Sequence, residues 1–173
     1  MDSLQIQKVE IPDVLELQRI SQQTFYETFH EYNTEENMKN YLTTHFSLEN
    51  LSSELVDRNS EFYFAKLNDK IIGYLKINFG NAQTERINPS ALEIERIYLI
   101  EKFQGRKIGI QLLQKAIYIA LQKSLNFVWL GVWEKNTKAI DFYKNNGFIE
   151  FDKHIFTLGS DEQLDILMKY VLP

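Results

Sequence analysis

Two stretches of the chain combine residue types that bind anions or move protons. The first, FQGRKIG (103–109), places two glycines and the bases Arg106 and Lys107 where a helix is expected to begin. Helix starts carry free N–H groups and partial positive charge, so they normally attract acids. Glycines there let backbone amides approach phosphate oxygens. The stretch predicts a pyrophosphate site; the alternative is a surface turn with incidental bases.

Two common phosphate motifs fit this stretch poorly. A P-loop ends a glycine-rich run in Gly-Lys-Ser or Gly-Lys-Thr, and the sequence contains no such run. A dinucleotide fingerprint needs Gly-x-Gly-x-x-Gly, whereas this loop has only Gly105 and Gly109. No acid ends the following strand at the distance that this fingerprint requires.

The strand expected before the loop, ALEIERIYLI (91–100), changes phase at Glu95-Arg96. In a regular strand the apolar residues on either side of this point would occupy opposite faces: Leu92 and Ile94, then Ile97 and Leu99. The phase change predicts a β-bulge, which frees backbone groups that a ligand could use. The alternative is that Glu95 and Arg96 form an ion pair on a half-exposed strand.

The second stretch is NTKAIDFYKNNGF (136–148), which predicts a helix capped by Asn136 and stopped by Gly147. Tyr143 lies seven residues after Asn136, two turns along the same helix face. A capping Asn and a helical Tyr are also common structural features, so this stretch alone does not establish chemistry.

Composition limits the classes of function. The net charge of −5 argues against nucleic acid as the main partner. Without cysteine there is no disulfide, thiolate metal site or cysteine nucleophile, and the three histidines (30, 45 and 154) show no metal spacing. No apolar run approaches the roughly 20 residues that span a bilayer. The beginning, MDSLQIQKVE, lacks the layout of a secretion signal, so a cytoplasmic protein without a membrane partner is expected.

Hydrophobic periodicity predicts a single α/β domain over residues 1–173 with one mixed sheet. The expected order is a strand, helices, three strands, a helix, a strand, a helix and two strands. The unit from 92 to 133 predicts parallel neighbouring strands. The last two strands form a hairpin, 148–158 and 164–172, across the turn GSDEQ.

Together these stretches resemble the GCN5-related N-acetyltransferase (GNAT) family across nearly the whole chain. Gln104-Gly105-Arg106-Lys107-Ile108-Gly109 stands where that family has Gln/Arg-x-x-Gly-x-Gly/Ala. The family pattern N-x-x-A-x-x-F-Y-x-x-x-G-F is matched by Asn136, Ala139, Phe142, Tyr143, Gly147 and Phe148. The resemblance implies a mostly antiparallel sheet of about seven strands with helices on both faces. It also implies that the parallel strands 92–100 and 127–133 splay apart.

The resemblance implies acetyl-CoA as the acetyl donor. The expected CoA-binding residues are Ile97, Tyr98, Leu99, Gln104, Gly105, Arg106, Lys107, Ile108, Gly109, Ile110, Asn136 and Tyr143. The loop amides would hold the pyrophosphate, and the strand edge at 97–99 would pair with the pantetheine arm. Lys107 departs from the family, which has glycine there. We expect a negative φ at Lys107, with binding retained and less backbone freedom.

The resemblance also implies direct attack of a bound primary amine on the thioester, with no metal. In this scheme Tyr143 is the general acid, Glu95 the general base, and a backbone N–H near Ile97 or Tyr98 the oxyanion donor. A non-catalytic module that binds acyl-CoA for regulation is the alternative.

The acceptor is predicted from the acidic first third of the chain. Residues 11–61 hold ten acids against three bases, although solvated helix faces would give the same excess. The N-terminal stretch TFYETFHEYNTEENMKNYL resembles the PaiA-type subgroup, which implies spermidine or spermine as the acceptor. Glu27, Glu31 and Tyr32 are the expected binding residues. Another small amine or a protein N-terminus remains open, as does the choice between a monomer and a homodimer.

Overall fold

The computed structural model describes residues 3–173 as one sheet flanked by helices. Its strands are β1 (Leu4–Lys8), β2 (Ser60–Leu67), β3 (Lys70–Phe79), β4 (Ala91–Leu99), β5 (Phe127–Trp133), β6 (Ile149–Leu158) and β7 (Asp161–Val171). Its α-helices are α1 (Val14–Phe29), α2 (Glu35–His45), α3 (Leu48–Val56), α4 (Ile108–Gln122) and α5 (Thr137–Asn145). The predicted order of elements is confirmed.

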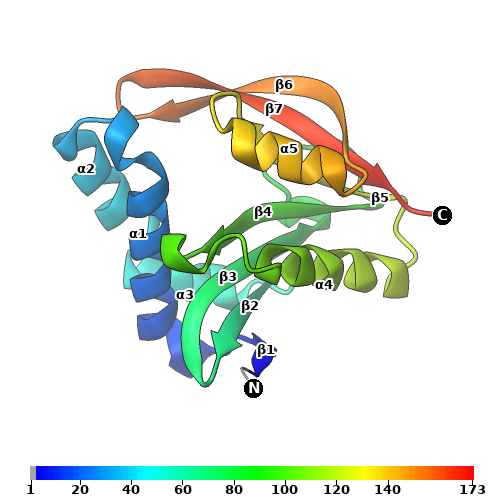
Figure 1. The fold of residues 1–173 in the computed structure, drawn as a ribbon, viewed down its shortest axis with the longest axis horizontal. Coiled ribbons are helices and arrows are strands. Elements are labelled where there is room, and N and C mark those ends of the chain that lie inside the picture. The colour runs from blue at the N-terminus through cyan, green and yellow to red at the C-terminus, as the bar shows by residue number, and fades with distance from the viewer. Residues whose placement is uncertain (1–2) are drawn as a thin grey trace.

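The sheet has the order β1-β2-β3-β4-β5-β7-β6 and is antiparallel except for the pair β4–β5. That parallel pairing covers only Ala91–Ile94 against Phe127–Leu130. Beyond these residues the strands separate, and Figure 1 shows β4 diverging from β7 and β6 towards α1. The predicted splayed pair is confirmed, and residues 95–99 of β4 have no strand on their β5 side.

The predicted bulge lies in β4. Lys76 faces Arg96 and Ile77 faces Ile94, so Glu95 is the extra residue without a partner on β3. The apolar residues on the two sides of the bulge all pack on one core: Leu92, Ile94, Ile97 and Leu99. The extra residue restores the alternation that the phase change had broken, so the predicted bulge is confirmed.

Helices cover both faces of the sheet. The face covered by α4 and α5 packs on one apolar core, which includes Leu112, Leu113 and Ile140. The face covered by α1, α2 and α3 packs on a second core, which includes Leu17, Phe25 and others. The sheet can therefore present different side chains on each side of the opening between β4 and β5.

Polar side chains cap the starts of α2 and α3. Thr34 accepts a hydrogen bond from the Asn37 N–H at the start of α2, and Ser47 accepts one from the Asn50 N–H at the start of α3. Gly147 has φ +90° after α5, as expected of a helix stop. Short polar side chains thus determine where these helices begin.

The C-terminal hairpin differs from the prediction in one respect. β7 begins at Asp161 rather than at 164, because Gly159, with φ +63°, allows a tighter turn than the five-residue loop that was expected. One face of β7 consequently carries Asp161, Gln163 and Asp165, which are spaced two residues apart.

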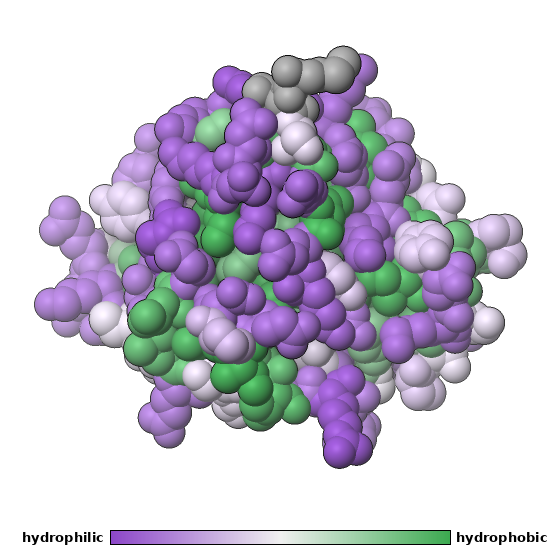
Figure 2. All heavy atoms as spheres, turned by 90° about the horizontal axis from the view of Figure 1, so that it is seen from below, coloured by the Kyte–Doolittle hydropathy of each residue, from purple (hydrophilic) through white to green (hydrophobic). Residues whose placement is uncertain are grey.

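Figure 2 views the molecule from below, where hydrophilic side chains cover most of the face and hydrophobic ones gather in smaller patches. Within residues 3–173, no helix is both long and apolar enough to cross a membrane.

Candidate active site

The loop at 103–109 presents backbone amides to solvent at the start of α4. Gly105 has φ +78° with no heavy atom within 4 Å of a Cβ placed there. No side chain caps the first turn of α4, in contrast to α2, α3 and α5. An uncapped helix start with open space beside it is a suitable receptor for phosphate oxygens. The geometry fits the predicted pyrophosphate site.

Lys107 is the N-cap of α4 and has φ +61°, in the left-handed region. The expectation of a negative φ was therefore wrong. The turn from β4 into α4 requires a left-handed residue here, and glycine is the residue that adopts this conformation without a steric cost. Lys107 carries that cost together with its positive charge.

A pair of variants tests this strain. The left-handed conformation costs an L-residue about 1 kcal/mol. Lys107→Gly should therefore have a free energy of unfolding about 1 kcal/mol higher than the matched Lys107→Ala, which also lacks the charge. Urea denaturation of the CoA-free proteins measures the difference. A Lys107→Ala variant as stable as Lys107→Gly would contradict a left-handed residue at this position.

The β4 edge at Ile97–Leu99 faces the opening, while its other edge pairs with β3. Gln104 bonds the Leu99 carbonyl through Nε2 at 3.4 Å and accepts from Lys138 Nζ on α5 at 3.2 Å. These two bonds connect the loop to both sides of the opening. The predicted strand edge and loop residues therefore lie side by side.

Asn136 and Tyr143 lie on the α5 side of the opening. The Asn136 Oδ1 accepts a hydrogen bond from the Ala139 N–H at 3.2 Å, so its cap role is present in the fold. Tyr143 is buried, and burial raises the pKa of its phenol above the usual value of 10. Burial is the main reason that the pKa of Tyr98 on β4 is raised, and the charge of an ionised Tyr143 adds to that rise, so the two phenols are electrostatic neighbours. Tyr143 stays protonated at neutral pH, as a proton donor must.

Glu95 belongs to a buried group of ion pairs. Its carboxylate contacts Lys76, lies 3.2 Å from Arg96 and accepts from Asn78 at 2.7 Å. Arg96 also makes two 2.9 Å hydrogen bonds with Glu54 of α3. Burial acts to raise the pKa of Glu95, but the charges of Arg96 and Lys76 lower it overall. A carboxylate so paired holds the bulge in place and is a weak proton acceptor.

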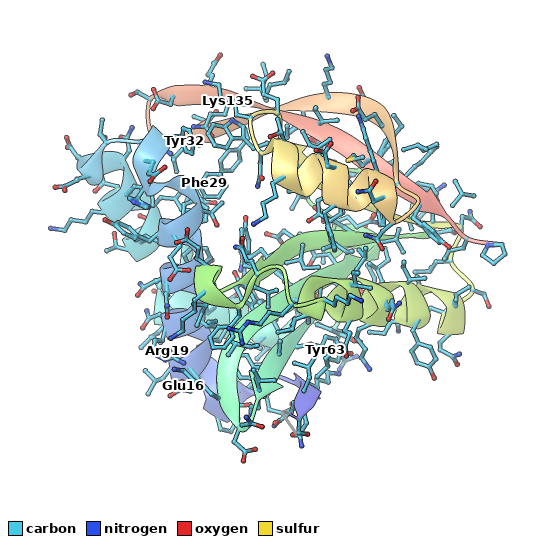
Figure 3. The ribbon with its side chains drawn as sticks, viewed as in Figure 1. Glu16, Arg19, Phe29, Tyr32, Tyr63 and Lys135 are labelled. Carbon is cyan, nitrogen blue, oxygen red and sulfur yellow. The ribbon has the colours of Figure 1, made fainter. Side chains whose placement is uncertain are left out.

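A polar cavity of about 290 Å³ lies where β5 ends. Its lining is mostly acidic and aromatic: Tyr32, Trp133, Glu134, Lys135, Asp161, Glu162 and Gln163. The Tyr32 and Trp133 rings meet edge to face, with centroids 4.7 Å apart. Figure 3 shows Phe29, Tyr32 and Lys135 close together at this place. Aromatic walls beside carboxylates suit a cationic ligand with an aliphatic chain.

The three predicted acceptor residues lie in different settings. Tyr32 lines the cavity, and Glu31 precedes it in the same 3₁₀ turn (His30–Tyr32). Glu27 accepts a hydrogen bond from the Glu101 N–H at 2.8 Å and therefore holds the turn that leads into the loop at 103–109. The acids of the β7 end were not predicted as site residues, because that segment was expected only to be the turn of a hairpin. The two adjacent acids in GSDEQ, Asp161 and Glu162, were the available signal.

Known proteins are similar to this chain in both sequence and fold. The family model described as "Acetyltransferase (GNAT) family" matches residues 15–148. An uncharacterized N-acetyltransferase of Lactobacillus delbrueckii subsp. lactis is 40% identical over 99% of each chain. A spermidine N(1)-acetyltransferase of Thermoplasma acidophilum is 28% identical over 92% of this chain and 94% of its own. The crystal structure of the PaiA N-acetyltransferase from Thermoplasma acidophilum in complex with coenzyme A superposes with a TM-score of 0.81, at 26% identity over 98% of this chain and 99% of that one.

Proposed function

Because this chain belongs to the GNAT family and is an acetyl-CoA-dependent acetyltransferase, we propose that its acceptor is a polyamine such as spermidine or spermine. The observation that carries the proposal is the acidic cavity with Tyr32 and Trp133 in its wall, at the open end of β5. Family membership removes the alternative of a non-catalytic module. Similarity to the spermidine N(1)-acetyltransferase and to the PaiA N-acetyltransferase of Thermoplasma acidophilum adds support.

In this proposal acetyl-CoA binds to the loop at 103–109 and to the free edge of β4. The amides from Gly105 to Ile110 receive the pyrophosphate, with Arg106 and Lys107 adding charge and Gln104 beside them. The backbone of Ile97–Leu99 pairs with the pantetheine arm, and the free amide nitrogen of Asn136 donates to it. A backbone N–H at Ile97 or Tyr98 holds the thioester carbonyl.

The reaction is direct transfer. The amine attacks the thioester carbon, and the buried Tyr143 phenol protonates the leaving thiolate. Glu95 is proposed to act by holding the bulge that orients this strand edge, because its carboxylate is occupied by Lys76 and Arg96. The chain has no cysteine to form an acetyl-enzyme intermediate.

The acceptor lies in the cavity with its ammonium groups near Glu134, Asp161 and Glu162. Tyr32 packs against its methylenes and Glu31 adds charge at the entrance. Glu27 acts indirectly, by holding the turn at Glu101. Each partly exposed pair is worth about 0–1 kcal/mol, so affinity comes from several pairs together.

Removing two negative charges from the cavity tests whether the acceptor is a polyamine. Asp161→Asn with Glu162→Gln should raise the KM for spermidine by up to about thirtyfold, since two pairs of up to about 1 kcal/mol each are lost. The KM for acetyl-CoA should change little. Raising the salt concentration from low to physiological should also raise the KM of the wild-type protein, because screening acts over about 8–10 Å. Steady-state kinetics measures all three values.

Asp152→Asn is the matched control, because Asp152 is an exposed acid of β6 outside the cavity. Efficient turnover of another amine, with spermidine and spermine left unacetylated, would refute the polyamine. Lys135 in the cavity wall favours one second candidate, an acceptor that carries a carboxylate, such as an amino acid or a peptide. The amine panel therefore includes amino acids beside their amides: a preference for the free acid supports this candidate.

A further inference from the structure

The fork of the sheet, the place where β4 and β5 separate, is bordered by Asp165, an acid that the reaction described above does not use. Parallel pairing ends at Ile94 and Leu130, so Glu95 and Gly131 are the first residues beyond it on the two strands. Asp165 of β7 lies beside Gly131 of β5. A Cβ built on Gly131 would be 3.4 Å from the Asp165 Oδ2. Gly131 is exposed, so a ligand can reach the fork beside this carboxylate.

Asp165 shares a face of the sheet with the acidic cavity. It is in register with Trp133, which lines the cavity. On β7 it shares a face with Asp161 and Gln163, which also line the cavity, because these residues are spaced two apart. Asp161 and Asp165 are four residues apart, a span of about 14 Å in a strand. An extended amine can therefore have one end in the cavity and the other at the fork.

Tyr143 lies on the opposite face, within the core under α4 and α5. The opening thus has a phenol on one side and a carboxylate on the other. Acetyl transfer needs this arrangement, because the amine loses its proton on the acceptor side while the sulfur gains one on the CoA side.

We propose that Asp165 is the catalytic base, whose carboxylate takes one proton from the acceptor ammonium at the fork and later releases it to solvent. The neutral amine forms the C–N bond to the thioester carbon as the C–S bond breaks. The thiolate receives its proton from Tyr143, and the second proton of the amine returns to the Tyr143 oxygen. The inference rests on acetyl transfer to an amine, and holds whether or not that amine is a polyamine.

The surroundings of Asp165 suit a base better than those of Glu95. Within residues 3–173, no protein group donates a hydrogen bond to the Asp165 carboxylate, whereas Asn78 donates one to Glu95. Burial raises the pKa of Asp165 to about 6, against a smaller lowering by His154.

The charged groups around Asp165 come from three elements. His154 of β6 is in register with it and contacts Glu85 of the loop before β4. On β4, Glu93 and Glu95 lie on the same face, where both accept from Asn78. Asp165 is therefore ionised at neutral pH and able to accept a proton, since burial raises its pKa only to about 6 and the charge of His154 acts in the opposite direction.

The pH dependence of kcat/KM tests the assignment. In the wild-type enzyme, kcat/KM for spermidine should fall below about pH 6 as Asp165 becomes protonated. Alkyl ammonium groups titrate near pH 10, so between pH 5 and 7.5 this acidic limb of the pH profile reports a titrating group of the enzyme and not of the substrate. Asp165→Asn should lose the limb and lower kcat at neutral pH by about tenfold or more. His154→Gln should move the limb to higher pH, because a positive charge that lowers the pKa of Asp165 is removed.

Glu95→Gln is the comparison, and thermal unfolding checks that each variant is folded. A limb that persists in Asp165→Asn overturns the assignment, as does a rise in the amine KM with kcat unchanged, which would make Asp165 a binding group. Loss of the limb in Glu95→Gln alone assigns the base to Glu95. If spermidine is not acetylated, the polyamine proposal fails, and the same profiles are measured with the best primary amine of the panel. Persistence of the limb there refutes the role of Asp165 separately.

Discussion

Tyr143→Phe is expected to lower kcat by about two orders of magnitude while the affinity for CoA stays nearly unchanged. The substitution keeps a ring that packs against Phe142 and Phe148 and removes only the hydroxyl. Because burial raises the pKa of this phenol, the wild-type group remains protonated throughout the working range. The thiolate leaving group would then have to take its proton from water.

Steady-state kinetics gives kcat, and calorimetry with CoA gives the affinity. Tyr118→Phe is the matched control, since Tyr118 is an exposed tyrosine on α4. The control should retain wild-type kcat. A Tyr143→Phe enzyme with unchanged kcat would remove the phenol from the mechanism, and a large loss of CoA affinity would make it a binding residue.

Gly109→Asp is expected to weaken CoA binding by about a hundredfold, because like charges about 5 Å apart near a protein surface repel by about 3 kcal/mol. Gly109 lies in the first turn of α4, beside the amides that are proposed to hold the pyrophosphate. An acid in the first turn stabilises a helix, so the variant should remain folded. Loss of binding would then come from the ligand site.

Gly109→Ala separates charge from size. A Cβ at this position would meet Phe142 at 3.5 Å, which is ordinary contact, so the alanine variant should bind CoA nearly as well as the wild type. Calorimetry on both folded variants decides. Unchanged CoA affinity in Gly109→Asp would mean that the loop is only a turn.

The order of the elements could be predicted because it depends on local physics. Alternating and helical periodicities identified the seven strands and the helices, and Asn136 marked the start of α5 through its bond to an amide three residues away. The phase change at Glu95 located the bulge, because side-chain alternation has a period of two and one extra residue shows directly in the sequence.

Long-range contacts decided what these elements do at the site. The left-handed Lys107 depends on how β4 must turn into α4, and the use of Glu27 depends on an amide 74 residues away. Pairing with Lys76 and Arg96 makes Glu95 a weak base, and β7 brings Asp165 over Gly131. Periodicity reports which face a residue occupies on its own element. The pKa and the partners of a carboxylate depend on groups brought together from distant elements, so they arise only when the sheet is assembled.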